Sequence, residues 1–346
     1  MIFSTKIKIE IFILVTSIRE KRIMSCYEYE KYVTSKEKMR ETLEKYGVAI
    51  IPNVLDEKEC DNMLSGIWDY FEHISQKWET PINRKNEKSW RGFYELFPSH
   101  SMLVQHWNIG HSQACWDVRQ NEKVLDIYSH FWNCSKDELL TSFDGLSFNI
   151  PPEVTKKGWN RNNCWLHSDQ SFTENDFKCV QGWVTALDIN EDDATLSFLE
   201  GSHNFHEHFA REFEITEKDN WYKLDDIEKE FYYNNECYYR KIKCPKGSLV
   251  LWDSRTIHCG VEANKGRAKP NFRAIIYTCY MPRQLATKKE LEKRRKAFEE
   301  MRMTSHWPCK VKLFPKMPRT YGKELPTITC IEKPKLEEIG YKLVGY

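Results

Sequence analysis

The sequence has no Cys-x-x-Cys pair, although it holds 12 cysteines among its 346 residues. The cysteines are scattered from Cys26 to Cys330, without the close pairs that tetrahedral zinc sites use. In a chain of this length, such scattered cysteines are typical of reduced, buried thiols rather than of a secreted disulfide scaffold. The sequence therefore gives no support to a cysteine-based zinc site, and it predicts a cytoplasmic protein.

Neither sign of charge dominates, and long hydrophobic runs are missing. The 52 Lys and Arg residues balance the 51 Asp and Glu residues, so the total charge gives no reason to expect a nucleic-acid-binding protein. The apolar run 11–15 is far too short to span a bilayer, and no small-residue cleavage site is evident near it. We expect residues 1–34 to be a disordered leader, with Met24 as an alternative start. A weak amphipathic membrane anchor is the alternative interpretation of residues 1–23.

Helical patterns precede strand patterns along the chain. Helices are predicted at 35–46, from residue 56 onward and at 117–133. Short strands separated by turns follow, at 145–150, 163–168, 178–188, 195–199, 238–243, 248–252 and 272–280. This pattern is typical of a double-stranded β-helix, a cupin-like jelly roll. We predict an α+β fold flanked by N-terminal helices, with a β core at about 145–283 inside a domain of residues 35–285.

A histidine and an aspartate two positions apart form the most informative motif. His167 and Asp169 follow the apolar segment 164–166, and alternate side chains of a strand point to the same side. His258 lies 89 positions after Asp169, beyond the apolar run 249–252. Two imidazoles and one carboxylate can occupy one face of an octahedral Fe(II) ion, leaving positions open for a co-substrate and O₂. We therefore predict His167, Asp169 and His258 as the catalytic iron ligands.

An arginine at the start of an apolar strand completes the predicted centre. Arg273 precedes the apolar run 274–277, where a buried cation is costly unless an anion pairs with it. The planar guanidinium suits a carboxylate, because it offers a rigid fork of donors. Together with the iron motif, Arg273 points to 2-oxoglutarate as the co-substrate.

A second histidine cluster, His203, His206 and His208, offers an alternative metal site. Helical spacing would place His203 and His206 on one face, so zinc is conceivable. However, no fourth ligand is apparent, and the segment 201–203 is typical of a turn whose polar groups satisfy the backbone. We favour the turn.

The C-terminal extension, residues 286–346, is basic in its first part. Residues 286–323 hold 12 Lys and Arg against 4 Glu, and they include a predicted helix at 288–301. We expect a solvated helix face packed on or beside the core. The alternative is an electrostatic surface for an anionic substrate or for a nucleic-acid or protein partner. Charge reversal of Lys293, Arg294 and Arg295 would separate the two interpretations.

Several segments, in order along the chain, resemble the phytanoyl-CoA dioxygenase-like family of Fe(II)/2-oxoglutarate oxygenases. They are the helix end, glycine and strand at 45–55, the His-Ser-Asp motif at 167–169, the strands at 181–188 and 196–203 that close on Gly-Ser-His, and finally His258 and Arg273. The resemblance covers roughly residues 40–283. It implies the following residues: His167, Asp169 and His258 as catalytic metal ligands, Arg273 as the partner of the distal 2-oxoglutarate carboxylate, and Gln181 and Trp183 as weaker candidates that line the site.

Two features depart from the family pattern. Residues 192–195 replace the usual Asn-Gly before the closing turn, and Arg273 lies 15 residues after His258, farther than in relatives. A longer loop at 263–271 would absorb the difference. The spacing leaves Arg267 as an alternative, although it lies in the loop rather than in a strand.

The resemblance implies an Fe(II)- and 2-oxoglutarate-dependent dioxygenase that uses O₂ to hydroxylate a C–H bond and releases succinate and CO₂. Asp169 favours hydroxylation, because related halogenases carry a small residue at that position. We expect a small-molecule substrate. The alternatives are a cupin-like binding protein without turnover, and a hydroxylase that holds a protein or nucleic acid through residues 286–323. Neither the substrate nor the oligomeric state follows from the sequence.

Overall fold

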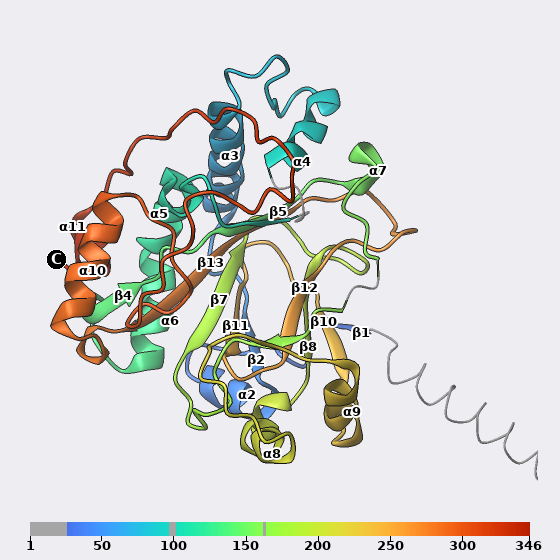
Figure 1. Ribbon diagram of the computed structural model, residues 1–346, viewed down its shortest axis with the longest axis vertical. Helices are drawn as coiled ribbons and strands as arrows, with labels where there is room; N and C mark the ends of the chain where they lie inside the picture. Colours follow the sequence, from blue (N-terminus) through green and yellow to red (C-terminus); the bar gives the residue numbers. More distant parts are fainter. Residues whose placement is uncertain (1–25, 97–101, 162–163) are drawn as a thin grey trace, which may run out of the picture.

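The computed structural model describes residues 26–96, 102–161 and 164–346. Two mostly antiparallel sheets form the centre of the molecule, and helices pack outside them (Figure 1). The predicted α+β fold with a jelly-roll core is thus confirmed. Within the described ranges, no helix is long and apolar enough to cross a membrane.

The smaller sheet has the strand order β1, β10, β8, β12, β6, β9. These strands span, in that order, Cys26–Glu28, Tyr239–Ile242, Thr195–Leu199, His258–Val261, His167–Ser168 and Tyr222–Lys223. The pair β1–β10 is parallel, and the others are antiparallel. The register places His258 directly opposite His167, so two residues far apart in sequence become neighbours across the sheet.

The larger sheet has the strand order β2, β11, β7, β13, β5, β3. These strands span, in that order, Val48–Ile51, Leu249–Asp253, Val180–Thr185, Arg273–Pro282, Leu146–Asn149 and Leu103–Val104. A further strand, β4 (Leu139–Thr141), pairs with the far end of β13. Every residue of β2, β5, β7 and β11 is buried, which explains why their sequences are apolar runs rather than alternating patterns.

The α-helices form three groups along the chain, and Figure 1 shows them around the two sheets. The N-terminal group is α2 (Met39–Tyr46), α3 (Glu57–Ile74), α4 (Phe93–Leu96), α5 (Gln113–Arg119) and α6 (Glu122–Trp132). The middle group is α7 (Pro152–Thr155), α8 (His206–Glu212) and α9 (Asp226–Asn234). The C-terminal pair is α10 (Lys288–Glu299) and α11 (Glu338–Val344), which lies beside β4.

Helix α3 shows how the outer layer is built. Its first turn is closed by a capping box, in which Asp56 accepts from the Glu59 amide at 3.0 Å and Glu59 accepts from the Asp56 amide at 2.7 Å. Phe71, on its buried face, stacks on Phe148 of β5 with ring centroids 5.4 Å apart. Full burial of such an aromatic side chain stabilises the fold by about 1.5–3 kcal/mol, so α3 is held against the larger sheet mainly by this apolar face.

Gly47 joins α2 to β2 at a point where only glycine fits. Its φ is +79°, and a Cβ there would lie 2.5 Å from Thr256 Oγ1. The Gly47 carbonyl accepts from Thr256 Oγ1 at 3.0 Å and from the Asp253 amide at 3.1 Å. This close approach fixes the loop that leads into His258.

Three boundaries differ from the sequence prediction. The predicted leader ends too late, because β1 pairs with β10 and Tyr27 and Tyr32 are buried; residues 1–25 lie outside the described ranges. The predicted helix 117–133 is two helices, because the side chain of Asn121 accepts from amides of the next turn and starts α6 anew. Strand β12 was not predicted.

The C-terminal extension packs on the core. Phe298 of α10 and Leu343 and Val344 of α11 belong to the same buried cluster as Phe143, which precedes β5. Figure 1 shows the chain of the extension passing across the molecule, and it contacts α5 and the end of α3: the Lys335 amide donates to Gln113 Oε1 at 2.8 Å, and the Thr329 amide donates to the Ile74 carbonyl at 2.9 Å.

Candidate active site

The three predicted ligand residues meet where β6 and β12 pair in the smaller sheet. His167 opens β6, Asp169 follows it, and His258 opens β12. His258 Nε2 lies 3.3 Å from Asp169 Oδ2, and His167 Nε2 lies 3.6 Å from Asp169 Oδ1. One ligand atom from each residue lies within 4.8 Å of the other two, and all three residues are buried. Within the described part of the chain, no other group of His, Cys, Asp and Glu has this arrangement.

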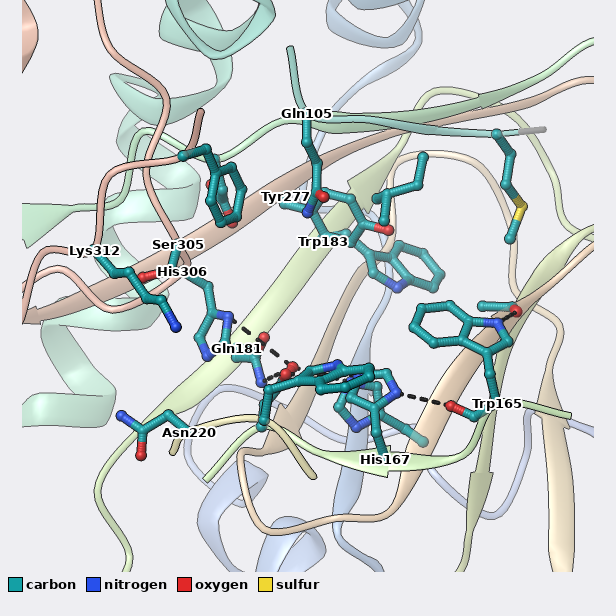
Figure 2. A pocket seen from close by; sticks show the side chains of 18 of the residues that line it. Gln105, Trp165, His167, Gln181, Trp183, Asn220, Tyr277, Ser305, His306 and Lys312 are labelled. Carbon is teal, nitrogen blue, oxygen red and sulfur yellow. Dashed lines mark hydrogen bonds and ion pairs between the residues drawn. The ribbon is translucent and has the colours of Figure 1, made fainter. Parts of the chain in front are cut away.

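Backbone carbonyls fix the tautomer of both histidines. His167 Nδ1 lies 3.1 Å from the Trp165 carbonyl, and His258 Nδ1 lies 2.8 Å from the Thr256 carbonyl (Figure 2 shows the first). A carbonyl only accepts hydrogen bonds, so each Nδ1 carries the hydrogen and each neutral ring presents a lone pair at Nε2. This is the usual way in which proteins orient metal-binding histidines.

The charge state of the cluster also suits a cation. Burial alone would raise the pKa of Asp169, but the neighbouring side chains of His306, His167 and His258 hold that pKa well below its ordinary value. Burial, together with the neighbouring His167, lowers the pKa of His258. A carboxylate that stays ionised and an imidazole that stays neutral are ready to bind a metal ion.

Arg273 lies in the same cavity, at the start of β13. Its Nη1 donates to the Thr195 carbonyl at 2.9 Å, and its buried Nε has no hydrogen-bond partner among the described residues. Burial lowers the pKa of its guanidinium. Arg267 differs, because it is paired with Glu153 at 2.7 Å and with Asp193 at 2.8 Å. The structure therefore leaves Arg273, and not Arg267, facing the cavity with donor capacity to spare.

The two weaker candidates also line the cavity. Gln181 Nε2 donates to Asp169 Oδ2 at 3.0 Å and so restrains the carboxylate. Trp183 is fully buried, and the guanidinium carbon of Arg273 lies 5.9 Å from the centroid of the Trp183 ring. Both belong to β7, where alternate residues point to the same face.

The second histidine cluster is structural. His203 Nε2 lies 3.0 Å from the Glu44 carbonyl, and His206 Nε2 lies 3.0 Å from the Ser171 carbonyl. The rings thus bind separate backbone groups, as the turn interpretation requires. His208 packs against Phe231 with ring centroids 5.0 Å apart.

Comparison with known proteins agrees with this geometry. The family model described as Phytanoyl-CoA dioxygenase (PhyH) matches residues 43–268, well over half of the chain. The chain belongs to the phytanoyl-CoA dioxygenase family. The predicted cofactors, iron and 2-oxoglutarate, are confirmed by this membership and by the His–Asp–His cluster, whose nitrogen and carboxylate donors fit Fe(II).

Individual relatives are distant. A protein of Aspergillus versicolor, "Ava biosynthesis cluster protein O", is 26% identical over 277 residues, which cover 78% of this chain and 85% of that protein. The match to the crystal structure of the hypothetical protein JW0805 from Escherichia coli has a TM-score of 0.55 and 13% sequence identity. It covers 99% of this chain and 92% of the chain of JW0805. The structure of the epimerase SnoN with Fe³⁺, alpha ketoglutarate and nogalamycin RO has a TM-score of 0.45 and 15% identity, and covers 71% of this chain and 83% of that one.

Several cavity residues of this family member were not predicted. The cavity has a volume of about 1420 Å³. Its wall includes Trp165, which stacks on the His167 ring with centroids 4.7 Å apart, and Trp221, a half-exposed residue 5.8 Å from the same ring. The C-terminal extension adds a further wall, for which the sequence offered only the alternative interpretation of residues 286–323 as a surface for an anionic substrate. Its residues in the cavity are Glu290, Lys293, Ser305, His306, Trp307, Lys310, Val311, Lys312, Leu313, Phe314 and Lys323.

Proposed function

We propose that this protein is a dioxygenase that hydroxylates a C–H bond of a small molecule, with His167, Asp169 and His258 holding Fe(II) and Arg273 holding the distal carboxylate of 2-oxoglutarate. The observation that carries the proposal is the convergence of two Nε2 lone pairs and one carboxylate in a buried cavity that also contains the unpaired edge of Arg273. Family membership supports the same chemistry.

When bound, Fe(II) and 2-oxoglutarate supply the activation of O₂ for hydroxylation, with succinate and CO₂ as products. The protein supplies position and surroundings. The carbonyls of Trp165 and Thr256 hold the two imidazoles in the metal-binding tautomer, and Gln181 holds Asp169 by one oxygen. The stacked ring of Trp165 shields His167 from water on one face.

Asp169 supports hydroxylation as the outcome. Related halogenases carry a small residue at this position, which leaves a metal site open for a halide ion. Here the Asp169 carboxylate takes that place, so chloride has no corresponding site. Arg273 is suited to the co-substrate, because a buried guanidinium with a free edge gains most from an anion that brings two oxygens. Trp183 presents its ring to the guanidinium from one side.

A small molecule is the substrate class that the cavity supports. The volume of about 1420 Å³ exceeds that of common small-ligand pockets, so it has room for the co-substrate and a second molecule together. The first alternative, a binding protein without turnover, is disfavoured by the completeness of the ligand set.

Anaerobic titration of the purified protein tests the proposal. We expect Fe(II) and 2-oxoglutarate together, but neither alone, to produce a visible metal-to-ligand charge-transfer band. The band should be absent in His167→Ala and weakened in Arg273→Ala, whereas the exposed-site variant His208→Ala should retain it. A folded protein that never gives the band would contradict the proposal and would favour a binding protein.

A further inference from the structure

The part of the C-terminal extension that faces the triad is a hairpin, residues 304–313, which we call the substrate wall. Thr304 and Leu313 form an antiparallel bridge, and the Ser305 amide donates to the Lys312 carbonyl at 2.9 Å. Ser305 and Lys312 are therefore neighbours across the two strands, and both line the cavity. Figure 2 shows His306 and Lys312 reaching into the cavity from the same side, opposite Trp165.

The substrate wall is fixed to the rest of the fold on both sides. The Thr304 amide donates to the Phe143 carbonyl at 3.0 Å, and Thr304 Oγ1 accepts from the Phe143 amide at 2.9 Å. At the other side, Glu290 of α10 accepts from the Val311 amide at 2.8 Å, and Lys293 donates to the Val311 carbonyl. A hairpin held at both ends can present side chains at defined positions.

Three consecutive residues of the substrate wall present buried polar atoms without a partner. They are Ser305 Oγ, His306 Nε2 and Trp307 Nε1, none of which has a hydrogen-bond partner among the described residues. The His306 ring lies beside the triad, with Nδ1 4.0 Å from Asp169 Oδ2. Buried polar groups are almost always satisfied, so three successive exceptions along one cavity wall indicate a ligand that accepts hydrogen bonds.

The same wall carries positive charge without compensation. Lys312 lines the cavity and forms no ion pair with any described residue. Lys310 and Lys323 line the same cavity, and they too form no ion pair with a described residue. Eight Lys and Arg residues line the cavity, against five acidic residues, which are Asp144, Asp169, Asp219, Glu262 and Glu290. The local charge therefore favours an anion.

We propose that the substrate is an organic anion, whose carboxylate or phosphate group is bound by Lys312, His306 and Ser305 of the substrate wall and whose apolar body lies against Trp221. This inference rests on the proposed function and adds the substrate class to it. Arg273 is the partner of the co-substrate, so the substrate wall is the second anion site of the same cavity. Trp221 is half exposed at the cavity and offers an apolar surface to the rest of the substrate.

Probe binding to the protein loaded with Fe(II) and 2-oxoglutarate without oxygen tests the proposal. The probes are phenylacetate and phenyl phosphate, with neutral phenylacetamide as the matched comparison, and the readout is calorimetric affinity. We expect at least one anionic probe to bind about tenfold or more tightly than phenylacetamide, which corresponds to one charge-assisted hydrogen bond. The ratio between the two anionic probes distinguishes a carboxylate from a phosphate site.

Lys312→Met should remove the preference for the anionic probe, and Lys312→Arg should keep part of it. The control is Lys316→Met, because Lys316 is an exposed lysine of the same extension that does not line the cavity. The 2-oxoglutarate titration of Lys312→Met should stay within twofold of the wild type, because the substrate wall does not hold the co-substrate.

The outcomes that contradict this inference differ from the outcome that contradicts the proposed function. Equal affinity for neutral and anionic probes, or an unchanged preference in Lys312→Met, overturns the inference. A loss of 2-oxoglutarate affinity in Lys312→Met as large as that in Arg273→Met also overturns it, because the lysine would then hold the co-substrate. Loss of the charge-transfer band in the wild type would instead overturn the proposed function itself.

Discussion

The C-terminal extension depends on one buried arginine, and Arg294→Met is the variant that tests this. The Arg294 side chain, only 1% exposed, donates to four backbone carbonyls. The acceptors are Thr141 at 2.6 Å, Pro308 at 2.8 Å, Leu343 at 2.8 Å and Val344 at 3.1 Å. One side chain of α10 thus joins β4, the substrate wall and α11.

The expected loss of stability follows from opposing contributions. Four hydrogen bonds from a charged group contribute about 1.5–3 kcal/mol each. Burial of the guanidinium costs several kcal/mol, and burial lowers its pKa to about 10. Met restores apolar contact with the Phe143 ring but leaves four carbonyls without a donor. We expect the free energy of unfolding to fall by about 3–5 kcal/mol, as when one partner of a buried charged pair is removed.

Urea unfolding, followed by circular dichroism and tryptophan fluorescence, measures this change. The control is Lys296→Met, two positions farther along α10, where the side chain is 77% exposed and the expected change is within about 0.5 kcal/mol. The reasoning is refuted if Arg294→Met unfolds at the same urea concentration as Lys296→Met, since the four hydrogen bonds would then contribute nothing net.

Three further predictions concern the site and its surroundings. Asp169→Ala should abolish succinate production from 2-oxoglutarate, and turnover like that of the wild type would exclude the predicted iron ligands. Arg273→Met should raise the KM for 2-oxoglutarate about tenfold or more, because a charge-assisted pair is lost; an unchanged KM would assign the carboxylate to another residue. Burial lowers the pKa of His111 to about 3, so the unfolded state binds more protons below about pH 6.5 and stability falls as the pH falls toward 3. His111→Gln keeps a donor for the Arg302 carbonyl but cannot take up this proton. Urea unfolding at pH 6, 5 and 4 should therefore show that the free energy of unfolding of the variant depends on pH less steeply than that of the wild type, by about 1.4 kcal/mol per pH unit. The same pH dependence in both proteins would contradict the prediction.

The His167 and Asp169 part of the triad could be predicted from the sequence, because it follows a local rule. His167 and Asp169 are two positions apart on extended chain, and that spacing alone places both side chains on one side. His258 was predicted as a ligand beyond the apolar run 249–252, but the strand β12 that it opens was not predicted. The segment His258–Val261 includes a glycine and a histidine, and it is a strand because β6 and β8 pair with it on both sides. Pairing partners of this kind do not show in a local pattern.

For the extension, the sequence offered a surface for an anionic substrate only as an alternative, and it did not indicate which residues are buried. Arg294 was grouped with Lys293 and Arg295 as a surface charge, although it is fully buried. A signal existed: Arg294 lies three positions after Leu291 and four before Phe298, on the apolar side of the helix. An arginine inside an apolar stripe indicates a buried charge with several acceptors. His306 gave no such signal, because a single histidine in a loop has no pattern.

The positions of the metal ligands and of the substrate wall along the chain separate the iron chemistry from the proposed recognition of the substrate. The family match ends at residue 268, and the substrate wall begins at residue 304. The metal ligands lie inside the matched range, so the iron chemistry belongs to the part of the chain that is common to the family. The wall proposed to bind the substrate lies outside that range. It is anchored by Phe143, by Arg294 and by Glu290 and Lys293 of α10. Changes in the wall should therefore alter probe affinity while the charge-transfer band stays intact, whereas changes in the triad should remove the band first.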